Sequence, residues 1–147
     1  KNIKLTLICS ADKYQKIGNL IDVNKLEGWI DYTKEETFPE LNADLLLDLV
    51  GGDAGKKALV VVKAGGRVVV LPSIWAEALK EAGADKNLQV EGFIAKPNAE
   101  DLSDVLKQVA EGKLKLHIQK TYPLAKTADA HQSLETGDTF GKIVLEV

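Results

Sequence analysis

Apolar residues in this chain form short continuous runs separated by stretches with helical spacing. An apolar run at Leu45–Val50 ends in two glycines, and a second run, Arg67–Leu71, follows another glycine pair. The segment between the runs opens with Asp53, a candidate N-cap. Its apolar residues recur at helical spacing: Ala54, Ala58, Leu59 and Val62. Two apolar strands joined by a helix are typical of a parallel β-α-β unit whose sheet is buried on both faces.

The sequence on either side predicts further strands and helices in alternation. Strand-like runs occupy residues 3–9, 29–32, 87–94, 114–122 and 143–147. Helices are predicted from Ser10 to Gly18, from Ser73 to Gly83, from Asn98 to Gly112 and from Pro123 to Gly137. The helix after Asn98 has the clearest apolar stripe: Leu102, Val105, Leu106 and Val109. Residues 19–28 fit either a helical turn or an irregular insertion. The alternation predicts an α/β fold with a doubly wound parallel sheet.

Size and composition narrow the classes of function. A chain of 147 residues is long enough for one domain, or for one domain with a small appendage. A net charge of −3 without a basic stripe argues against a nucleic-acid partner. No apolar run approaches the ~18 residues needed to cross a membrane. The chain has a single cysteine, Cys9, which excludes an internal disulfide, and its two histidines leave little from which to build a zinc site. Because the sequence relies on no disulfide, we expect a reducing, cytoplasmic setting.

Five segments, in order along the chain, resemble the zinc-free quinone oxidoreductase branch of the medium-chain dehydrogenases/reductases. They are WIDYTKEE, ADLLLDLVGG, KAGGRVVVLPS, VEGFIAKPNAEDLSDVLKQVAEGKL and TYPLAKTADAHQSLETGDTFGKIVLEV. The resemblance implies a partial Rossmann nucleotide-binding domain over residues 1–112, without the first strand and glycine-rich turn of that fold. It further implies a C-terminal β-α-β tail over residues 113–147, which in the family returns to a GroES-like catalytic domain.

The family resemblance implies NADP as the cofactor and a quinone or enone as the substrate, with the chemistry carried by hydride transfer. A pyrophosphate is normally bound by a G-x-G-x-x-G turn at a helix N-terminus, and no such motif occurs in the sequence. Ser10, Lys13 and Tyr32 match the family's positions for the 2′-phosphate of NADP. A hydroxyl and an ammonium group suit a dianion, whereas Asp12 opposes strong binding. The alternative is that Ser10 caps a helix and Lys13 is solvated.

Further cofactor contacts are implied at the ends of later strands. They are Val50, Gly51, Pro72, Ser73, Phe93 and Lys142. The absence of a Cβ at Gly51 would let the nicotinamide ribose approach the backbone closely. Each position also has a local alternative: a tight turn for the glycines, a helix cap for Ser73, core packing for Phe93 and solvation for Lys142.

No nucleophile–base pair occurs in the sequence, and the catalytic residues stay unassigned. One hypothesis is that the chain is the cofactor-binding part of an NADPH-dependent quinone or enone oxidoreductase, not fully active alone. The alternative is a non-catalytic Rossmann-like module for assembly. An exposed sheet edge at the place of the first strand favours pairing with a complementing N-terminal fragment or with another copy. Gln89–Ile94 is the candidate strand for a homodimer, by resemblance.

Overall fold

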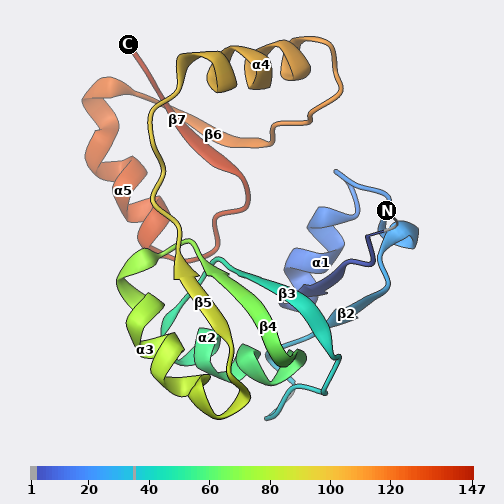
Figure 1. Cartoon of the computed structure of the whole chain (residues 1–147). Coiled ribbons are helices and arrows are strands. Elements are labelled where there is room, and N and C mark those ends of the chain that lie inside the picture. Colours follow the sequence, from blue (N-terminus) through green and yellow to red (C-terminus); the bar gives the residue numbers. More distant parts are fainter. Residues whose placement is uncertain (1–2, 35) are drawn as a thin grey trace. The chain divides into compact units, whose positions relative to one another are not determined.

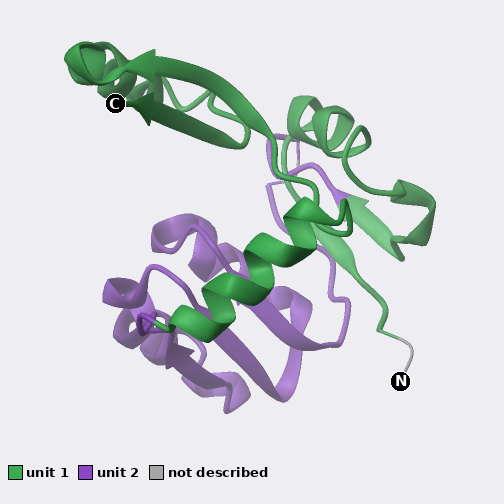
Figure 2. Cartoon of the chain, turned by 90° about the horizontal axis from the view of Figure 1, so that it is seen from above, with its two compact units in different colours: residues 1–29, 98–147 green, residues 30–97 purple. Residues whose placement is uncertain are grey.

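The computed structural model describes residues 3–34 and 36–147 of the chain. Its contacts divide the chain into two compact units (Figure 2). Unit 1 combines residues 1–29 with residues 98–147, and unit 2 comprises residues 30–97. The predicted domain boundary after residue 112 follows the architecture of the family and stays a prediction.

Unit 2 is built on a three-stranded parallel sheet in the order β3-β4-β5 (Figure 1). The strands are β3 (Ala43–Asp48), β4 (Val62–Val70) and β5 (Gln89–Gly92). They are joined by α2 (Gly52–Ala58) and α3 (Ala76–Ala82), together with the short 3-10 turns η2 (Leu59–Val61), η3 (Ser73–Trp75) and η4 (Ala84–Lys86). This arrangement confirms the predicted β-α-β unit and extends it by one strand.

The core of unit 2 lies on one face of this sheet. Along β4, Val68 and Val70 are fully buried and point to the same side as the fully buried Leu79 of α3. Right-handed crossovers place consecutive helices of such a unit on the same face. On β3, Leu45 and Leu47 point away from the helices, because side chains alternate between the two faces of a strand. These two leucines are 56% and 55% exposed. One face of the sheet is therefore packed, and the opposite face carries exposed leucines.

Two helix starts in unit 2 differ from the sequence prediction. Helix α2 begins at Gly52 and has Gly51 as its N-cap, so Asp53 lies within the first turn and is not the cap. Ser73 is also not a cap, because Ser73–Trp75 forms a 3-10 turn in which the Trp75 N–H donates to the Pro72 carbonyl at 3.0 Å. In both places the chain needs a turn on leaving the strand before it can enter a helix. Gly83 ends α3 as predicted.

Unit 1 contains the first and last elements of the chain. They are β1 (Thr6–Ile8), α1 (Ala11–Ile17), η1 (Val23–Lys25), β2 (Gly28–Ile30, whose last residue falls in unit 2), α4 (Ala99–Ala110), β6 (Ile118–Pro123), η5 (Leu124–Lys126), α5 (Thr127–Glu135) and β7 (Lys142–Glu146). Asn98 caps α4 as predicted, since its side-chain oxygen accepts from the N–H groups of Glu100 and Asp101 at 2.9 and 3.3 Å. Strands β6 and β7 pair in parallel with α5 between them, so the tail has the expected β-α-β form.

The strands form three separate sheets instead of the single doubly wound sheet that the sequence predicts. They are the pair β1-β2, the triplet β3-β4-β5 and the pair β6-β7. In the doubly wound order 3-2-1-4-5-6, strand 1 lies between strands 2 and 4 and joins the two halves of the sheet. The family resemblance implies that the chain begins at strand 2, so β1 would correspond to strand 2 and β3, two strands further on, to strand 4. Within residues 3–34 and 36–147 no strand takes the joining position, so the two halves stay separate.

No helix in the described parts of the chain combines the length and the apolar character that crossing a bilayer requires.

Asp31, just after β2, carries a buried carboxylate that accepts hydrogen bonds from Thr33, two residues further along the chain. The hydroxyl and the backbone N–H of Thr33 donate to Asp31 Oδ1 at 2.6 and 3.0 Å. Oδ2 accepts no hydrogen bond, and Lys34 Nζ lies 3.7 Å from it. The Thr33 hydroxyl bond, against an opposing effect of burial, lowers the pKa of Asp31 below its ordinary value. The ionised form of Asp31 is therefore the form that the fold favours.

A lowered pKa makes Asp31 a source of acid sensitivity. Its stabilising contribution is complete above the unfolded pKa of about 4 and is lost as the pH falls through the lower folded value. We expect Thr33→Val, which removes the hydroxyl donor, to reduce the loss of unfolding free energy between about pH 5 and about pH 2. Urea unfolding at a series of pH values measures this slope, with the exposed Thr37→Val as the matched control. An unchanged slope in Thr33→Val would contradict the assignment.

Candidate functional site

The carboxyl ends of β3, β4 and β5 lie level with one another at one edge of unit 2. In the strand register Asp48 pairs with Val70, and Val70 pairs with Gly92. The loops that follow these strand ends carry several of the predicted cofactor contacts: Val50, Gly51, Pro72, Ser73 and Phe93. Ligands of open parallel α/β sheets bind outside the carboxyl ends of the strands. The topology thus gathers these residues at the edge where a ligand is expected.

The first of these loops is organised by Asp48, the last residue of β3. Asp48 is 5% exposed, and its Oδ1 accepts hydrogen bonds from the backbone N–H groups of Val50 and Gly51, each at 3.0 Å. The Gly51 N–H is also 3.1 Å from Oδ2. On the other side, a Cβ at Gly55 would lie 2.8 Å from Oδ2, so α2 packs directly against the carboxylate. Asp48 thereby fixes the turn that leads from β3 into α2.

Sequence reasoning did not select Asp48 as a site residue. Asp and Asn side chains commonly accept from the backbone two residues further along the chain and so initiate turns. An aspartate two residues before Val50 and three before the glycine pair is the signal that would have pointed to this role.

Gly51 meets two demands that only glycine satisfies. Its φ of 71° and ψ of −161° lie in a region that is essentially closed to other residues. A Cβ at this position would lie 2.3 Å from Cδ1 and 2.7 Å from Cγ of the Trp75 indole. The tight-turn alternative for Gly51 is therefore correct, and the turn also accommodates an aromatic ring from the next loop. Trp75 was predicted only as an apolar helix residue.

The side chains around this turn are apolar and exposed. Val50 is 69% exposed, Phe93 is 53% exposed and Trp75 is 40% exposed. The core-packing alternative for Phe93 is therefore wrong, because the strand ends at Gly92 and the next side chain already lies outside the core. Since Asp48 is engaged by backbone amides, the edge suits an uncharged, planar part of a ligand. It offers no cradle for a pyrophosphate.

Ser10 and Lys13 belong to unit 1, at the end of β1. Ser10 is the N-cap of α1, and its hydroxyl oxygen accepts from the Lys13 N–H at 3.5 Å, which is the capping alternative. Asp12 forms an ion pair with Lys16 at 2.7 Å. The nearby Trp29 indole N–H donates to the Cys9 carbonyl at 2.9 Å. This bond fixes the end of β1 from which the Ser10 loop begins.

The two other predicted contacts lie apart from these clusters along the chain. Tyr32 belongs to unit 2 and is 51% exposed. Lys142 is exposed at the start of β7 in unit 1, where its backbone N–H donates to the His117 carbonyl at 2.9 Å. The roles of both residues toward a cofactor stay predictions.

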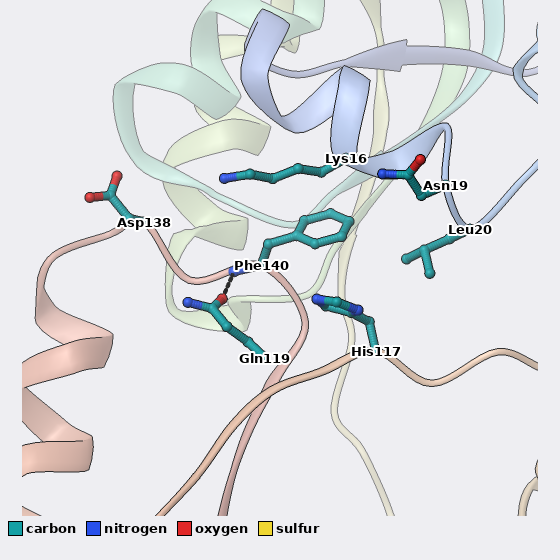
Figure 3. A pocket seen from close by; sticks show the side chains of 7 residues that line it. All are labelled: Lys16, Asn19, Leu20, His117, Gln119, Asp138 and Phe140. Carbon is teal, nitrogen blue, oxygen red and sulfur yellow. Dashed lines mark hydrogen bonds between the residues drawn. The ribbon is translucent and has the colours of Figure 1, made fainter.

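A separate cavity of about 260 Å³ lies in unit 1 (Figure 3). It is lined by Lys16, Asn19, Leu20, His117, Gln119, Asp138 and Phe140. The rings of His117 and Phe140 are 5.2 Å apart, and the Phe140 N–H donates to the Gln119 side-chain oxygen. The predicted cofactor contacts do not line this cavity, so it is not part of the candidate site.

A parallel sheet whose strands are joined by helices defines the class of open α/β proteins, whose ligands bind outside the carboxyl ends of the strands. Residues 11–145 match the protein family described as zinc-binding dehydrogenase, and the chain therefore belongs to this family of the medium-chain dehydrogenases/reductases. It corresponds to the C-terminal, Rossmann-like half of these proteins. Within residues 3–34 and 36–147, no group of three or more His, Cys, Asp or Glu side chains is placed to hold a metal ion. The described residues therefore do not fit a zinc centre.

Relatives and solved structures agree with this assignment. The chain is 38% identical over 120 residues to the 2-methylene-furan-3-one reductase of Solanum lycopersicum and 32% identical over 120 residues to the chloroplastic NADPH-dependent alkenal/one oxidoreductase of Arabidopsis thaliana. Each match covers 79% of this chain but only 27% and 28% of the respective relative. The quinone oxidoreductase from Coxiella burnetii superimposes with a TM-score of 0.78 at 28% identity. That match covers 100% of this chain and 54% of the other, so the chain spans about half of the solved protein.

Substitution of Gly51 tests the turn at the candidate site. We expect Gly51→Ala to destabilise unit 2 by more than Gly65→Ala, because both glycines have positive φ but a Cβ at Gly65 meets no atom within 4 Å. The backbone strain alone costs about 1–3 kcal/mol at each position, and the clash with the Trp75 indole adds about 1–3 kcal/mol at Gly51 only. Urea unfolding of the two variants measures the difference. Equal losses would show that the indole does not restrict Gly51.

Proposed function

We propose that this chain is the cofactor-binding part of an NADPH-dependent oxidoreductase that reduces quinones or enones, in the zinc-free branch of its family. The observation that carries the proposal is the carboxyl edge of β3-β4-β5, where a glycine turn lies beside exposed apolar side chains. The names of the tomato, Arabidopsis and Coxiella proteins, which are enone, alkenal/one and quinone reductases, support the substrate class. A reducing, cytoplasmic setting is part of this proposal.

NADPH supplies the hydride when it is bound. In this proposal Val50, Gly51 and Phe93 contact the nicotinamide ribose and ring, and Pro72 and Ser73 border the same edge. Ser10, Lys13 and Tyr32 contact the 2′-phosphate, and Lys142 contacts the cofactor from the tail.

The pyrophosphate is the part of the cofactor that this chain does not accommodate. No G-x-G-x-x-G turn occurs in the sequence, and the strand that would precede such a turn has no counterpart among the described residues. In the proposal these parts come from a complementing N-terminal fragment, together with the GroES-like domain. The chain by itself is therefore a partial enzyme.

Reconstitution tests the proposed function. A chimera joins the N-terminal half of the Coxiella quinone oxidoreductase to residues 1–147, and NADPH oxidation is followed with menadione as the acceptor. We expect the chimera to oxidise NADPH and the isolated chain to show no turnover. Turnover by the isolated chain would contradict its role as a partial enzyme. A folded chimera that binds NADPH but reduces neither menadione nor an enone would contradict the reductase assignment.

A second function, a non-catalytic assembly module, is favoured by the exposed side of β3. Among the residues that the structure describes, this strand pairs with a neighbour on one side only. Leu45 and Leu47 in the strand and Leu49 just after it are 56%, 55% and 64% exposed. Parallel sheets are almost always covered on both faces, and apolar edge strands pair readily with other chains. At the opposite edge of the same sheet, β5 covers Gln89–Gly92 of the proposed homodimer strand Gln89–Ile94.

Sedimentation velocity separates this second function from the first. If β3 mediates self-assembly, we expect the wild-type chain to sediment as a dimer and Leu47→Lys to sediment as a monomer, because a charge on an apolar edge strand blocks pairing. Leu102→Lys, a change on the exposed stripe of α4, is the matched control and leaves the dimer intact. A monomeric wild-type chain would contradict the assembly function.

A further inference from the structure

The cavity of unit 1 has a lining of its own, apart from the predicted cofactor contacts (Figure 3). Its volume is about 260 Å³. Pockets for drug-sized ligands typically have about 300–1,000 Å³. The cavity therefore suits a single ring system, and it is too small for a whole dinucleotide.

One wall of the cavity is a pair of aromatic rings from two neighbouring loops. The ring centroids of His117 and Phe140 are 5.2 Å apart, with 49° between the ring planes. The Phe140 N–H donates to the Gln119 side-chain oxygen, and the Lys142 N–H donates to the His117 carbonyl at 2.9 Å. A Cβ at Gly141 would collide with that carbonyl, so glycine lets the two loops touch. The rings are thus held in place by the backbone and form a preformed platform for a flat ligand.

Another wall comes from the end of α1, where Lys16, Asn19 and Leu20 line the cavity. The Leu20 N–H donates to the Ile17 carbonyl at 2.8 Å, and the Asn19 N–H donates to the Lys16 carbonyl at 3.2 Å. A turn therefore fixes the backbone of both lining residues. The Lys16 ammonium group lies 2.7 Å from the Asp12 carboxylate. Because this charge is already compensated, the wall offers an apolar side chain and an amide, but no uncompensated cation.

The polar groups of the lining include both donors and acceptors. Gln119 Oε1 accepts from the Phe140 N–H, which leaves Nε2 of the same amide to donate to a ligand. The Asp138 carboxylate supplies acceptors, and its side chain forms no hydrogen bond or ion pair within residues 3–34 and 36–147. The Asn19 amide can do either. A flat ring whose edge both donates and accepts complements this set.

We propose that this cavity binds a purine base, which stacks on Phe140 and forms hydrogen bonds with Gln119 Nε2 and the Asp138 carboxylate. The edge of an aminopurine carries ring nitrogens that accept and an amino group that donates, and its face stacks on aromatic side chains. A quinone has acceptors only, and a phosphate would meet the Asp138 charge without a cation to offset it. The proposed 2′-phosphate contacts Ser10 and Lys13 lie in the first turn of α1, whereas the cavity lies at its end.

Calorimetric titration of the 147-residue chain with adenosine tests the proposal. We expect adenosine to bind. Phe140→Leu removes the aromatic platform and should weaken binding about fivefold, the lower end of the contribution of one stacked base. Phe38→Leu, at a half-buried phenylalanine of unit 2 that does not line the cavity, is the matched control and keeps the wild-type affinity. No binding, or an equal loss in both variants, would overturn the inference.

Gln119→Glu separates a role in binding from a role in the loop. The new carboxylate can still accept from the Phe140 N–H, but the Nε2 donor is replaced by an acceptor. We expect the affinity for adenosine to fall about fivefold, the loss expected for one hydrogen bond. A merely structural Gln119 would leave the affinity unchanged, and that result would overturn the inference.

Competition defines the class of ligand and separates this site from the proposed function. We expect menadione, a flat ring with acceptors only, and NADPH to leave the affinity for adenosine unchanged. Displacement by menadione would make the cavity an unspecific apolar slot, and displacement by NADPH would assign it to the adenine of the cofactor. Either result would overturn the inference and leave the reductase proposal standing.

Discussion

The hydrogen bonds between the Asp48 carboxylate and the backbone N–H groups of Val50 and Gly51 are the constraint on which the candidate site depends. They form where β3 ends, and they leave Gly51 in a conformation that requires glycine. With no Cβ at Gly51, the Trp75 indole can lie against the turn, and with none at Gly55, α2 can lie against the carboxylate. One buried carboxylate therefore fixes the turn after β3, against which both α2 and the Trp75 side chain from the loop after β4 are packed. A buried charge of this kind is tolerated because both of its oxygens accept from N–H groups.

The sequence predicted the ends of helices correctly where the hydrogen bonds at that end join residues close together in the chain. Asn98 caps α4, Gly83 ends α3, and Ser10 caps α1, because each signal depends on residues within one helical turn. The caps at Asp53 and Ser73 were wrong for a shared reason. Each follows a strand end at which the backbone must first turn. After β3 the turn places Gly51 at the N-cap of α2, so Asp53 already lies in the first turn of the helix, and after β4 the 3-10 turn Ser73–Trp75 precedes α3.

The association of the strands depends on contacts that are distant in sequence, and it was predicted only in part. The alternation of apolar runs indicated parallel strands, which are present, but it did not indicate how many sheets they form. For the candidate site, the carboxyl-edge loops followed from topology, whereas the roles of Asp48 and Trp75 did not. Both roles depend on where a side chain from one loop meets the backbone of another, and residue spacing along one segment carries no such information.

The two units differ in how their residues are distributed along the chain. Unit 2 is continuous, whereas unit 1 combines the first residues with the last and is interrupted by the whole of unit 2. During synthesis the residues of unit 2 leave the ribosome as one block, and domains generally fold as units in the order of their synthesis. Unit 1 can fold only after its C-terminal residues have emerged. If unit 2 has folded by then, the two segments of unit 1 are joined by a shorter effective loop, and bringing them together costs less entropy. The order of elements along the chain thus favours a sequential assembly in which the sheet with the candidate site is complete first.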